Sequence, residues 1–167
     1  LDLSYEILKN SKKLIIMQCT SEYPCPPERI GLNVLDTIKK RYNVDVGFSD
    51  HSMGYAASFA AAALGTFVIE KHFTFSRLMY GSDASISMEP HEFKIFTQGI
   101  RDIWTMLENP IDKDDIDRYN DMKIVFQKSI VSSTALEKGH VLKQNDLSFK
   151  KPGDGIPASE WKNIIGK

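Results

Sequence analysis

The sequence predicts an α/β protein in which three successive strand–helix units are followed by a small, mostly β domain. In the first two thirds of the chain, short apolar runs typical of buried strands alternate with longer segments whose apolar residues recur at helical spacing. In the last third, short strand-like runs separated by turns that contain Gly and Pro replace this alternation. We therefore expect one domain over residues 1–109, a linker over 110–123 and a second, incomplete domain over 124–167.

Each element of the first domain is predicted from its own pattern. Helix 55–64 is followed by Gly65, the residue type that most readily adopts a left-handed cap. The start of helix 89–107 is predicted from Pro90, since proline is favoured in the first turn of a helix. The predicted strands cover 13–20, 44–48 and 66–69, and the predicted helices cover 1–10, 28–42, 55–64 and 89–107.

The linker and the second domain differ in texture from what precedes them. Residues 110–123 contain five aspartates among a few basic residues, which favours a solvated connection. Beyond it, short strands are predicted at 129–134, near Val141 and at 147–149, with a turn at 152–155.

The composition describes a globular chain without a charge bias. Of its 167 residues 42% are hydrophobic, and the formal net charge is -1, so the chain offers no excess of positive charge for nucleic acid or an anionic membrane. No apolar run approaches the roughly 18 residues of a membrane span, and the N-terminus lacks a signal-peptide pattern. We therefore expect a cytoplasmic protein that binds neither nucleic acid nor membranes.

Two histidines stand where two consecutive predicted strands end. His51 follows strand 44–48 and His72 follows strand 66–69. The carboxyl ends of parallel strands meet at one edge of the sheet, so the two imidazoles are expected to converge there. Alternation along a strand places Ser49 on the face of His51 and Glu70 on the face of His72.

These residue types are suited to a divalent metal. Two imidazoles with oxygen ligands fit Mn²⁺, Zn²⁺ or Fe²⁺, and the carboxylate of Glu70 can orient a ligand or move a proton. The alternative is that each histidine only hydrogen-bonds backbone at a strand end.

Three strand–helix units cannot close a barrel of eight, which takes about 250 residues. An open sheet of three parallel strands leaves two bare edges. The alternatives are a small sheet completed by a partner chain and a fragment of a longer protein. We expect the fragment, because the chain also opens at Leu1 in place of Met.

Several motifs, in order and spacing, resemble the sialic acid synthase (N-acetylneuraminate synthase) family. They are CTSEYP at 19–24, VGFSDH at 46–51, ALGTFVIEKHFT at 63–74 and YGSD at 80–83. The tail KKPGDGI at 150–156 resembles the start of that family's antifreeze-like (SAF) domain. The resemblance spans nearly the whole chain.

The resemblance implies a fold and a reaction. Members of the family fold as a (β/α)8 TIM barrel followed by the SAF domain, which makes residues 1–109 the C-terminal part of the barrel. They condense phosphoenolpyruvate with an N-acylated amino sugar such as N-acetylmannosamine, release phosphate and form a nine-carbon 2-keto acid. They work as domain-swapped homodimers.

Site roles are implied residue by residue. The resemblance makes His51 and His72 the ligands of a divalent metal, usually Mn²⁺, with Mg²⁺ or Co²⁺ as alternatives, and Glu70 the active-site carboxylate. It assigns Ser49 and Ser21 to phosphoenolpyruvate, and Tyr23, Asp83 and Lys151 to the sugar. Two positions depart from the family pattern: Ser21 stands where many members have Asn, and Lys151 where Arg is usual, which keeps the charge but loses the bidentate fork.

Two other functions compete with the synthase. One is a non-catalytic sugar-binding fragment, favoured by the antifreeze-like tail and the missing half-barrel. The other is a metal-dependent hydrolase, whose barrels usually add a His-x-His strand. The family's phosphate-binding lysine would lie upstream of Leu1, so we expect the isolated chain to be inactive.

Overall fold

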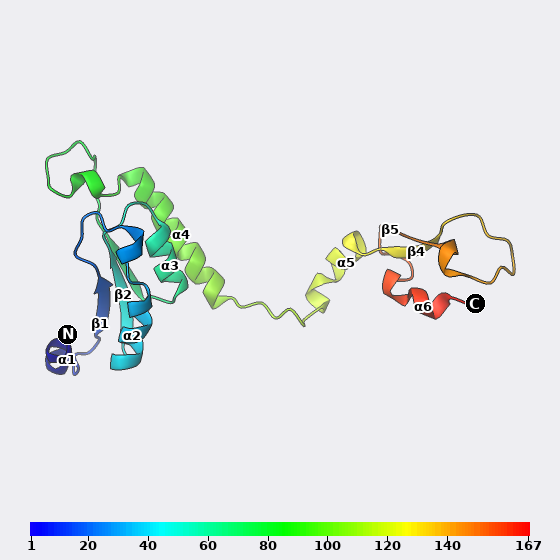
Figure 1. Ribbon diagram of the computed structural model, residues 1–167, viewed down its shortest axis with the longest axis horizontal. Helices are drawn as coiled ribbons and strands as arrows, with labels where there is room; N and C mark the ends of the chain where they lie inside the picture. The colour runs from blue at the N-terminus through cyan, green and yellow to red at the C-terminus, as the bar shows by residue number, and fades with distance from the viewer. The chain divides into compact units, whose positions relative to one another are not determined.

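The computed structural model describes all of residues 1–167 and divides them into two compact units, Leu1–Pro110 and Ile111–Lys167 (Figure 1). The alternation of strands and helices expected in the first unit is confirmed. Its elements are α1 (Asp2–Leu8), β1 (Ile15–Cys19), α2 (Asn33–Tyr42), β2 (Asp45–Asp50), α3 (Ala56–Ala63), β3 (Val68–Lys71) and α4 (Pro90–Glu108).

The three strands form one parallel sheet in the order β1-β2-β3. Ser49 in β2 is opposite Cys19 in β1 and Glu70 in β3, and Asp50 is opposite Lys71. The ends of the three strands therefore lie within one residue of each other in the register. The residues that follow them gather at one edge of the sheet.

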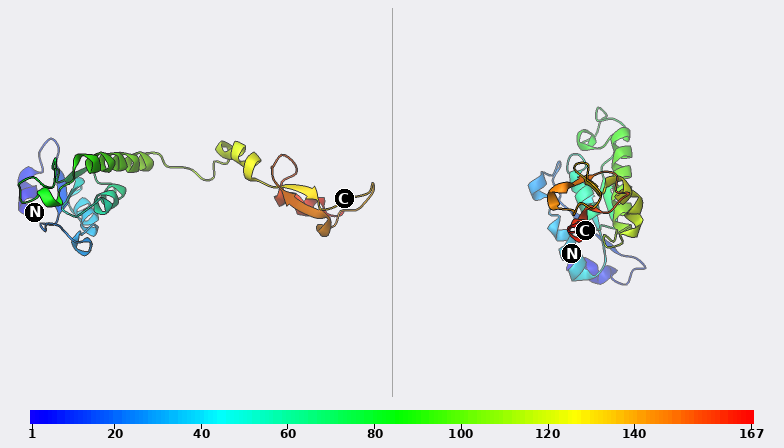
Figure 2. Two further views of the ribbon diagram at one scale, coloured as in Figure 1. Left: turned by 90° about the horizontal axis from the view of Figure 1, so that it is seen from above. Right: turned by 90° about the vertical axis from the view of Figure 1, so that its right-hand side faces the viewer.

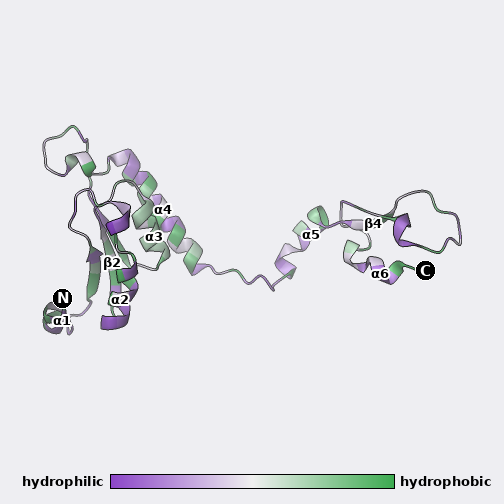
Figure 3. Ribbon diagram, in the orientation of Figure 1, coloured by the Kyte–Doolittle hydropathy of each residue, from purple (hydrophilic) through white to green (hydrophobic).

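Helices cover the sheet and create the core. Helix α2 packs on β1 and β2, α3 packs on β2 and β3, and α4 packs against α3. The largest fully buried side chain is Phe48 in the central strand. Helix α4 buries Phe96 and Ile100, and Figure 3 shows hydrophobic and hydrophilic segments alternating along it, as expected for a helix with one face in the core.

The helix predicted at 28–42 is wrong in its first third. Residues Pro27–Arg29 form a 3-10 turn, and α2 begins only at Asn33. Gly31 lies between them at φ +69°, a left-handed conformation that a right-handed helix cannot contain. Gly65, in contrast, follows α3 at φ +82°, as its predicted role as a left-handed cap requires.

Strand limits also differ from the prediction. Strand β2 continues through Ser49 to Asp50, and β3 covers 68–71 in place of 66–69. The last residues of each of these strands are polar and continue the hydrogen-bonded pairing through their backbone groups. A pattern of apolar residues therefore could not locate the end of the strand. The two histidines still follow directly, His51 after β2 and His72 after β3.

The second unit contains two short strands and two short helices. Its elements are α5 (Asn120–Phe126), β4 (Ser129–Ser132), β5 (Leu147–Lys150) and α6 (Trp161–Ile164). The strands β4 and β5 pair antiparallel and lie side by side in the left view of Figure 2. No strand forms at Val141; Leu142 instead exchanges backbone hydrogen bonds with Gly166 and Lys167. None of the helices is long and apolar enough to cross a membrane.

Candidate functional site

The two histidines lie close together at the carboxyl edge of the sheet. The centroids of the His51 and His72 rings are 5.2 Å apart, and the rings meet edge to face. This convergence is the one expected from the strand ends. It rests on the backbone register, because β2 and β3 are paired up to the residue before each histidine.

The His51 ring is buried and held in one orientation. Its Nδ1 lies 2.9 Å from the carbonyl oxygen of Thr20, so Nδ1–H donates to that carbonyl and Nε2 keeps its lone pair. The ring of Tyr23 stacks on it, with centroids 4.1 Å apart. The Sγ atom of Cys19 lies 3.9 Å from Nδ1. Backbone and aromatic contacts thus fix both the tautomer and the plane of His51.

The His72 ring is more open and faces the loop that carries Asp83. Its Nδ1 is 3.6 Å from Oδ2 of Asp83, and the Tyr23 ring is 5.6 Å away. The His72 carbonyl accepts a hydrogen bond from the N–H of Met88 at 2.9 Å, which closes the ends of the loop. Asp83 is therefore brought to the histidine pair by a closed loop that begins and ends beside β3.

Ser49 and Glu70 contact each other next to the histidines. The Ser49 hydroxyl donates to Oε1 of Glu70 at 2.6 Å, across the β2–β3 pairing. Strand alternation puts this pair on the same face as His51 and His72. A hydroxyl, a carboxylate and two imidazoles accordingly share one face at the end of the sheet.

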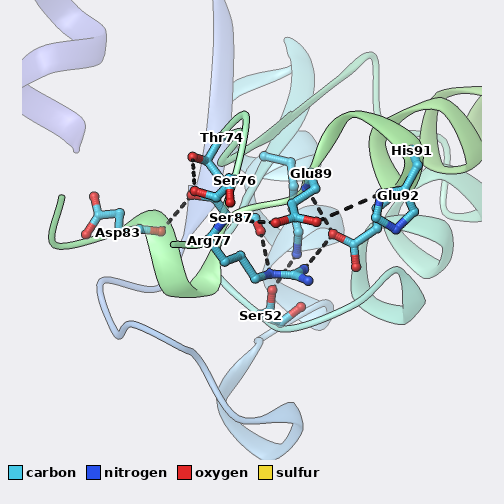
Figure 4. Close-up of polar contacts among 10 residues, drawn as sticks. Ser52, Thr74, Ser76, Arg77, Asp83, Ser87, Glu89, His91 and Glu92 are labelled. Carbon is cyan, nitrogen blue, oxygen red and sulfur yellow. Dashed lines mark hydrogen bonds and ion pairs between the residues drawn. The ribbon is translucent and has the colours of Figure 1, made fainter. Parts of the chain in front are cut away.

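Arg77, which the sequence reasoning did not single out, anchors the Asp83 loop to the start of α4 (Figure 4). Its backbone N–H donates to Oε1 of Glu89 at 2.9 Å, and its Nε donates to the carbonyl of Ser87 at 3.0 Å. Its Nη2 donates to Oε2 of Glu92 at 2.5 Å. Further along the loop, the Ser87 hydroxyl donates to the carbonyl of Asp83. These bonds tie the loop to a helix end.

A buried ion pair that was not predicted from the sequence lies on the other face of the sheet from the histidines. Asp50 and Lys71 are buried and in contact, at 2.9 Å. Burial opposes the charge of Asp50, but hydrogen bonds from Ser58, Ser52 and Lys71 outweigh it and hold the pKa of the carboxyl below its usual value. The signal was present in the sequence, since opposite charges at the ends of two neighbouring buried strands require each other.

His51 and His72 are suited to bind a divalent metal ion as two members of a larger set of ligands. The tautomer of His51 leaves Nε2 available, with the other ring nitrogen bound to a backbone carbonyl, as is usual for a metal ligand. No group of three or more His, Cys, Asp or Glu side chains lies close enough to hold an ion alone. The two imidazoles would therefore form part of a larger set of ligands.

Two of the predicted site residues lie outside this cluster. Ser21 is exposed in the loop after β1, two residues before Tyr23. Lys151 belongs to the second unit, where its Nζ lies 4.9 Å from the centroid of the Phe126 ring. The cluster itself thus consists of Tyr23, Ser49, His51, Glu70, His72 and Asp83.

Fold and site together define an α/β protein with a two-histidine candidate metal site at the carboxyl edge of its sheet, followed by a separate small unit. The chain belongs to the NeuB family, whose profile matches residues 2–112, and residues 127–167 match the SAF domain. The resemblance to the sialic acid synthase family is thereby confirmed.

The similar proteins cover between 73% and 98% of this chain. The N,N'-diacetyllegionaminic acid synthase of Campylobacter jejuni is 36% identical over an alignment of 164 residues and covers 96% of this chain and 49% of that protein. The N-acetylneuraminate-9-phosphate synthase of Homo sapiens is 32% identical over 98% of this chain and 46% of that protein. The structure of the N-acetylneuraminic acid (sialic acid) synthetase of Leptospira borgpetersenii, in complex with citrate, has a TM-score of 0.62 at 30% identity and covers 73% of this chain and 45% of that one. The chain spans about half the length of the relatives it matches.

Proposed function

We propose that this chain carries part of the active site of a synthase that condenses phosphoenolpyruvate with an N-acylated amino sugar to form a sialic acid or a related nonulosonate. The observation that carries the proposal is the cluster at the end of β2 and β3. Two imidazoles 5.2 Å apart and a Ser49–Glu70 pair share one face there, in a chain of the NeuB family. The named activities of the similar synthases support the same class of reaction.

His51 and His72 would hold the divalent metal, with Mn²⁺ preferred and Mg²⁺ or Co²⁺ as alternatives. The bound metal supplies Lewis acidity, which polarises the aldehyde of the open-chain sugar. The histidines' own part is to present two ring nitrogens from the same edge of the sheet. Thr20 and Tyr23 keep the ring of His51 from turning.

The condensation joins the enol carbon of phosphoenolpyruvate to the aldehyde carbon of the sugar. Water then adds to the cationic carbon that bears the phosphate, and the carbon–oxygen bond to phosphate breaks as the keto group forms. Glu70 would accept the proton of that water, and the Ser49 hydroxyl, which donates to its carboxylate, would orient it. Ser49 and Ser21 would also contact phosphoenolpyruvate as it enters.

The sugar would lie on the open side of the histidine pair. Tyr23 and Asp83 border this side, and Asp83 is the carboxylate suited to sugar hydroxyls. Lys151 would contribute its positive charge from the second unit of a neighbouring protomer. This arrangement requires a domain-swapped homodimer, as in the family.

The sheet supports a place within a (β/α)8 barrel. Strands β1 and β3 each pair with β2 only, so each has an edge with no strand beside it. Long unpaired edges of parallel strands are normally covered. Further strands added at both edges would close the barrel and bring additional side chains to the same carboxyl end.

The test is phosphate release by the full-length protein from phosphoenolpyruvate, with N-acylated amino sugars and Mn²⁺ supplied together. We expect release that depends on both sugar and metal, and its loss in His51→Ala and His72→Ala. Residues 1–167 alone should release none, since positioning catalysis needs every binding group in place. Release without a sugar, or unaffected by both substitutions, would contradict the proposal.

A further inference from the structure

Asp50 and Lys71, here called the clamp, form an ion pair closed off from solvent directly behind the two histidines. Nζ of Lys71 is 2.9 Å from Oδ2 of Asp50, and the two side chains are 2% and 0% exposed. The two residues face each other as the last pair of the β2–β3 ladder. The clamp therefore joins the ends of the two strands, one residue before His51 and one before His72.

The clamp also holds the backbone on the far side of His51. Oδ1 of Asp50 accepts the N–H of Ser52 at 2.8 Å, and Nζ of Lys71 donates to the Ser52 carbonyl at 2.5 Å. Oδ2 of Asp50 accepts the hydroxyl of Ser58, at 2.5 Å, from helix α3. His51 consequently stands between Asp50, which is one of the two charged residues, and Ser52, which is hydrogen-bonded to both of them.

Stability alone is a weak reason for such a pair. Removing two charges from water costs about as much as their attraction returns, and well-packed apolar replacements are often neutral or stabilising. A hydrogen-bonded ion pair is directional and is satisfied in only one geometry. Packing between apolar side chains does not impose such a geometry. That geometry sets the offset between the two strand ends.

We propose that Asp50 and Lys71 are positioning residues that fix the backbone at His51 against the backbone at His72, so that both imidazoles reach one metal ion. The inference rests on the metal site of the proposed function. It adds that the distance between the two ligands is determined on the opposite face of the sheet, by side chains that never touch the metal or a substrate.

The experiment removes the clamp without leaving a buried charge. In the full-length protein, Asp50→Leu/Lys71→Met replaces both charges by apolar groups of similar size. We expect a folded protein with a lowered unfolding temperature, because the N–H and carbonyl of Ser52 and the hydroxyl of Ser58 lose their partners. We also expect a Mn²⁺ dissociation constant at least tenfold higher by titration calorimetry, which is about 1.4 kcal/mol. The visible absorption of bound Co²⁺ should change as well, since it reports the coordination geometry.

The matched control applies the same two chemical changes to an exposed pair. Asp36 and Lys40 form an ion pair of 2.6 Å on the surface of α2. Asp36→Leu/Lys40→Met should bind Mn²⁺ like the wild type. His51→Ala and His72→Ala, measured alongside, should each lose Mn²⁺ binding.

Each outcome decides the matter. A folded clamp variant with wild-type Mn²⁺ affinity and Co²⁺ spectrum overturns the proposal, and if the histidine variants lose binding in the same series, the metal site itself stands. If the histidine variants also bind normally, the proposed metal site is wrong and the clamp proposal falls with it. If the double variant does not fold, Asp50→Asn replaces it, because the amide keeps an acceptor oxygen for the Ser52 N–H. Unchanged Mn²⁺ affinity of Asp50→Asn overturns the proposal. A severalfold loss of Mn²⁺ affinity in the folded Asp50→Asn protein supports it.

Discussion

The imidazole of His51 is fixed by residues that are distant in sequence. Thr20 accepts its Nδ1–H, Tyr23 stacks on its face, and the N–H of Cys25 donates to its carbonyl at 2.9 Å. All three belong to the loop after β1. The orientation of His51, a candidate metal ligand, thus depends on the loop after β1, which contains no candidate metal ligand itself.

Two variants of Tyr23 separate the contribution of its stacked ring from that of its hydroxyl. Tyr23→Phe keeps the stacked ring, so we expect unchanged Mn²⁺ affinity and a raised sugar KM, because the hydroxyl is lost. Tyr23→Ala removes the stacking as well, which is worth about 0.5–1.5 kcal/mol, and should weaken Mn²⁺ binding by about threefold. Titration calorimetry and steady-state kinetics on both variants check this. Equal metal affinities of the Phe and Ala variants would contradict it.

Gly47 allows β2 and β3 to approach each other. A Cβ atom at this position would lie 2.6 Å from Cγ1 and 3.1 Å from the carbonyl oxygen of Val68. Alanine reduces the entropy of the unfolded chain, which favours folding by about 0.4–1 kcal/mol, but crowding in a packed core costs about 1–3 kcal/mol. We expect Gly47→Ala to lower the free energy of unfolding in urea. A variant as stable as the wild type would show that the strands separate without cost.

At the scale of elements, the Asp83 loop and helix α4 stabilise each other. Glu89 and Glu92 form a capping box at the start of α4, and Arg77 from the loop bonds to both. The hydrogen bond from the Glu89 N–H, together with the Arg77 guanidinium, holds the pKa of Glu92 below its usual value of 4.5. The end of a helix and the loop of the site therefore share one ionised carboxylate.

This sharing predicts a pH dependence of stability. Because the pKa of Glu92 is lower in the folded than in the unfolded state, its contribution is present above pH 4.5 and is lost as the pH falls through the folded-state value. Glu92→Ala should cost about 1 kcal/mol at pH 7, and the difference from the wild type should shrink below pH 4.5. Urea unfolding of both proteins at several pH values measures it.

The control lies at the other end of the same helix. Glu108 is exposed in the last turn of α4, where a negative charge is unfavourable to the helix dipole. Glu108→Ala should therefore be neutral or slightly stabilising at pH 7. A Glu92→Ala difference that stays constant down to pH 3 would refute the assigned ionisation.

For the whole molecule, the proposed role of Lys151 links a residue of the second unit to the proposed site of the first. The turn that follows Lys151 is fixed within its own unit. The Ser129 hydroxyl donates to the Pro152 carbonyl at 2.8 Å and accepts the N–H of Gly155 at 2.9 Å. Lys151 is therefore presented from an ordered turn, as a group that acts on a neighbouring protomer would require.

Mixing a Lys151 variant with a His72 variant tests whether the site is shared between protomers. Full-length Lys151→Ala should raise the sugar KM and leave Mn²⁺ affinity unchanged, whereas Lys151→Arg should be neutral or beneficial. If the site is shared, mixed dimers of Lys151→Ala and His72→Ala contain one intact site, and activity rises above that of either variant alone. No rise, with mixed dimers confirmed by mass spectrometry, would mean that Lys151 serves its own chain or no site.

The sequence by itself determined the order of the elements and the places where the histidines stand. Apolar runs located the three parallel strands, and an alanine-rich run closed by Gly65 located α3. Helical periodicity located α4, because burial of apolar surface acts on each segment separately. The position of His51 and His72 at neighbouring strand ends, and the match of Ser49 and Glu70 to their face, followed from the period of a strand. The motifs that carry the family resemblance were also readable without coordinates.

The tertiary structure alone decided how these pieces are held. Gly31 interrupts the helix predicted over 28–42, and polar pairing extends β2 to Asp50, since backbone conformation and ladder hydrogen bonds leave no mark in an apolar pattern. The contacts of the Thr20 carbonyl and the Tyr23 ring with His51 join groups that are about thirty positions apart, and Arg77 meets Glu92 only because the loop folds back. Such contacts depend on distances and angles between whole elements, which local propensity does not contain. The buried pairing of Asp50 with Lys71 is the clearest case, because two charged residues become a single neutral unit only when β2 and β3 are in register.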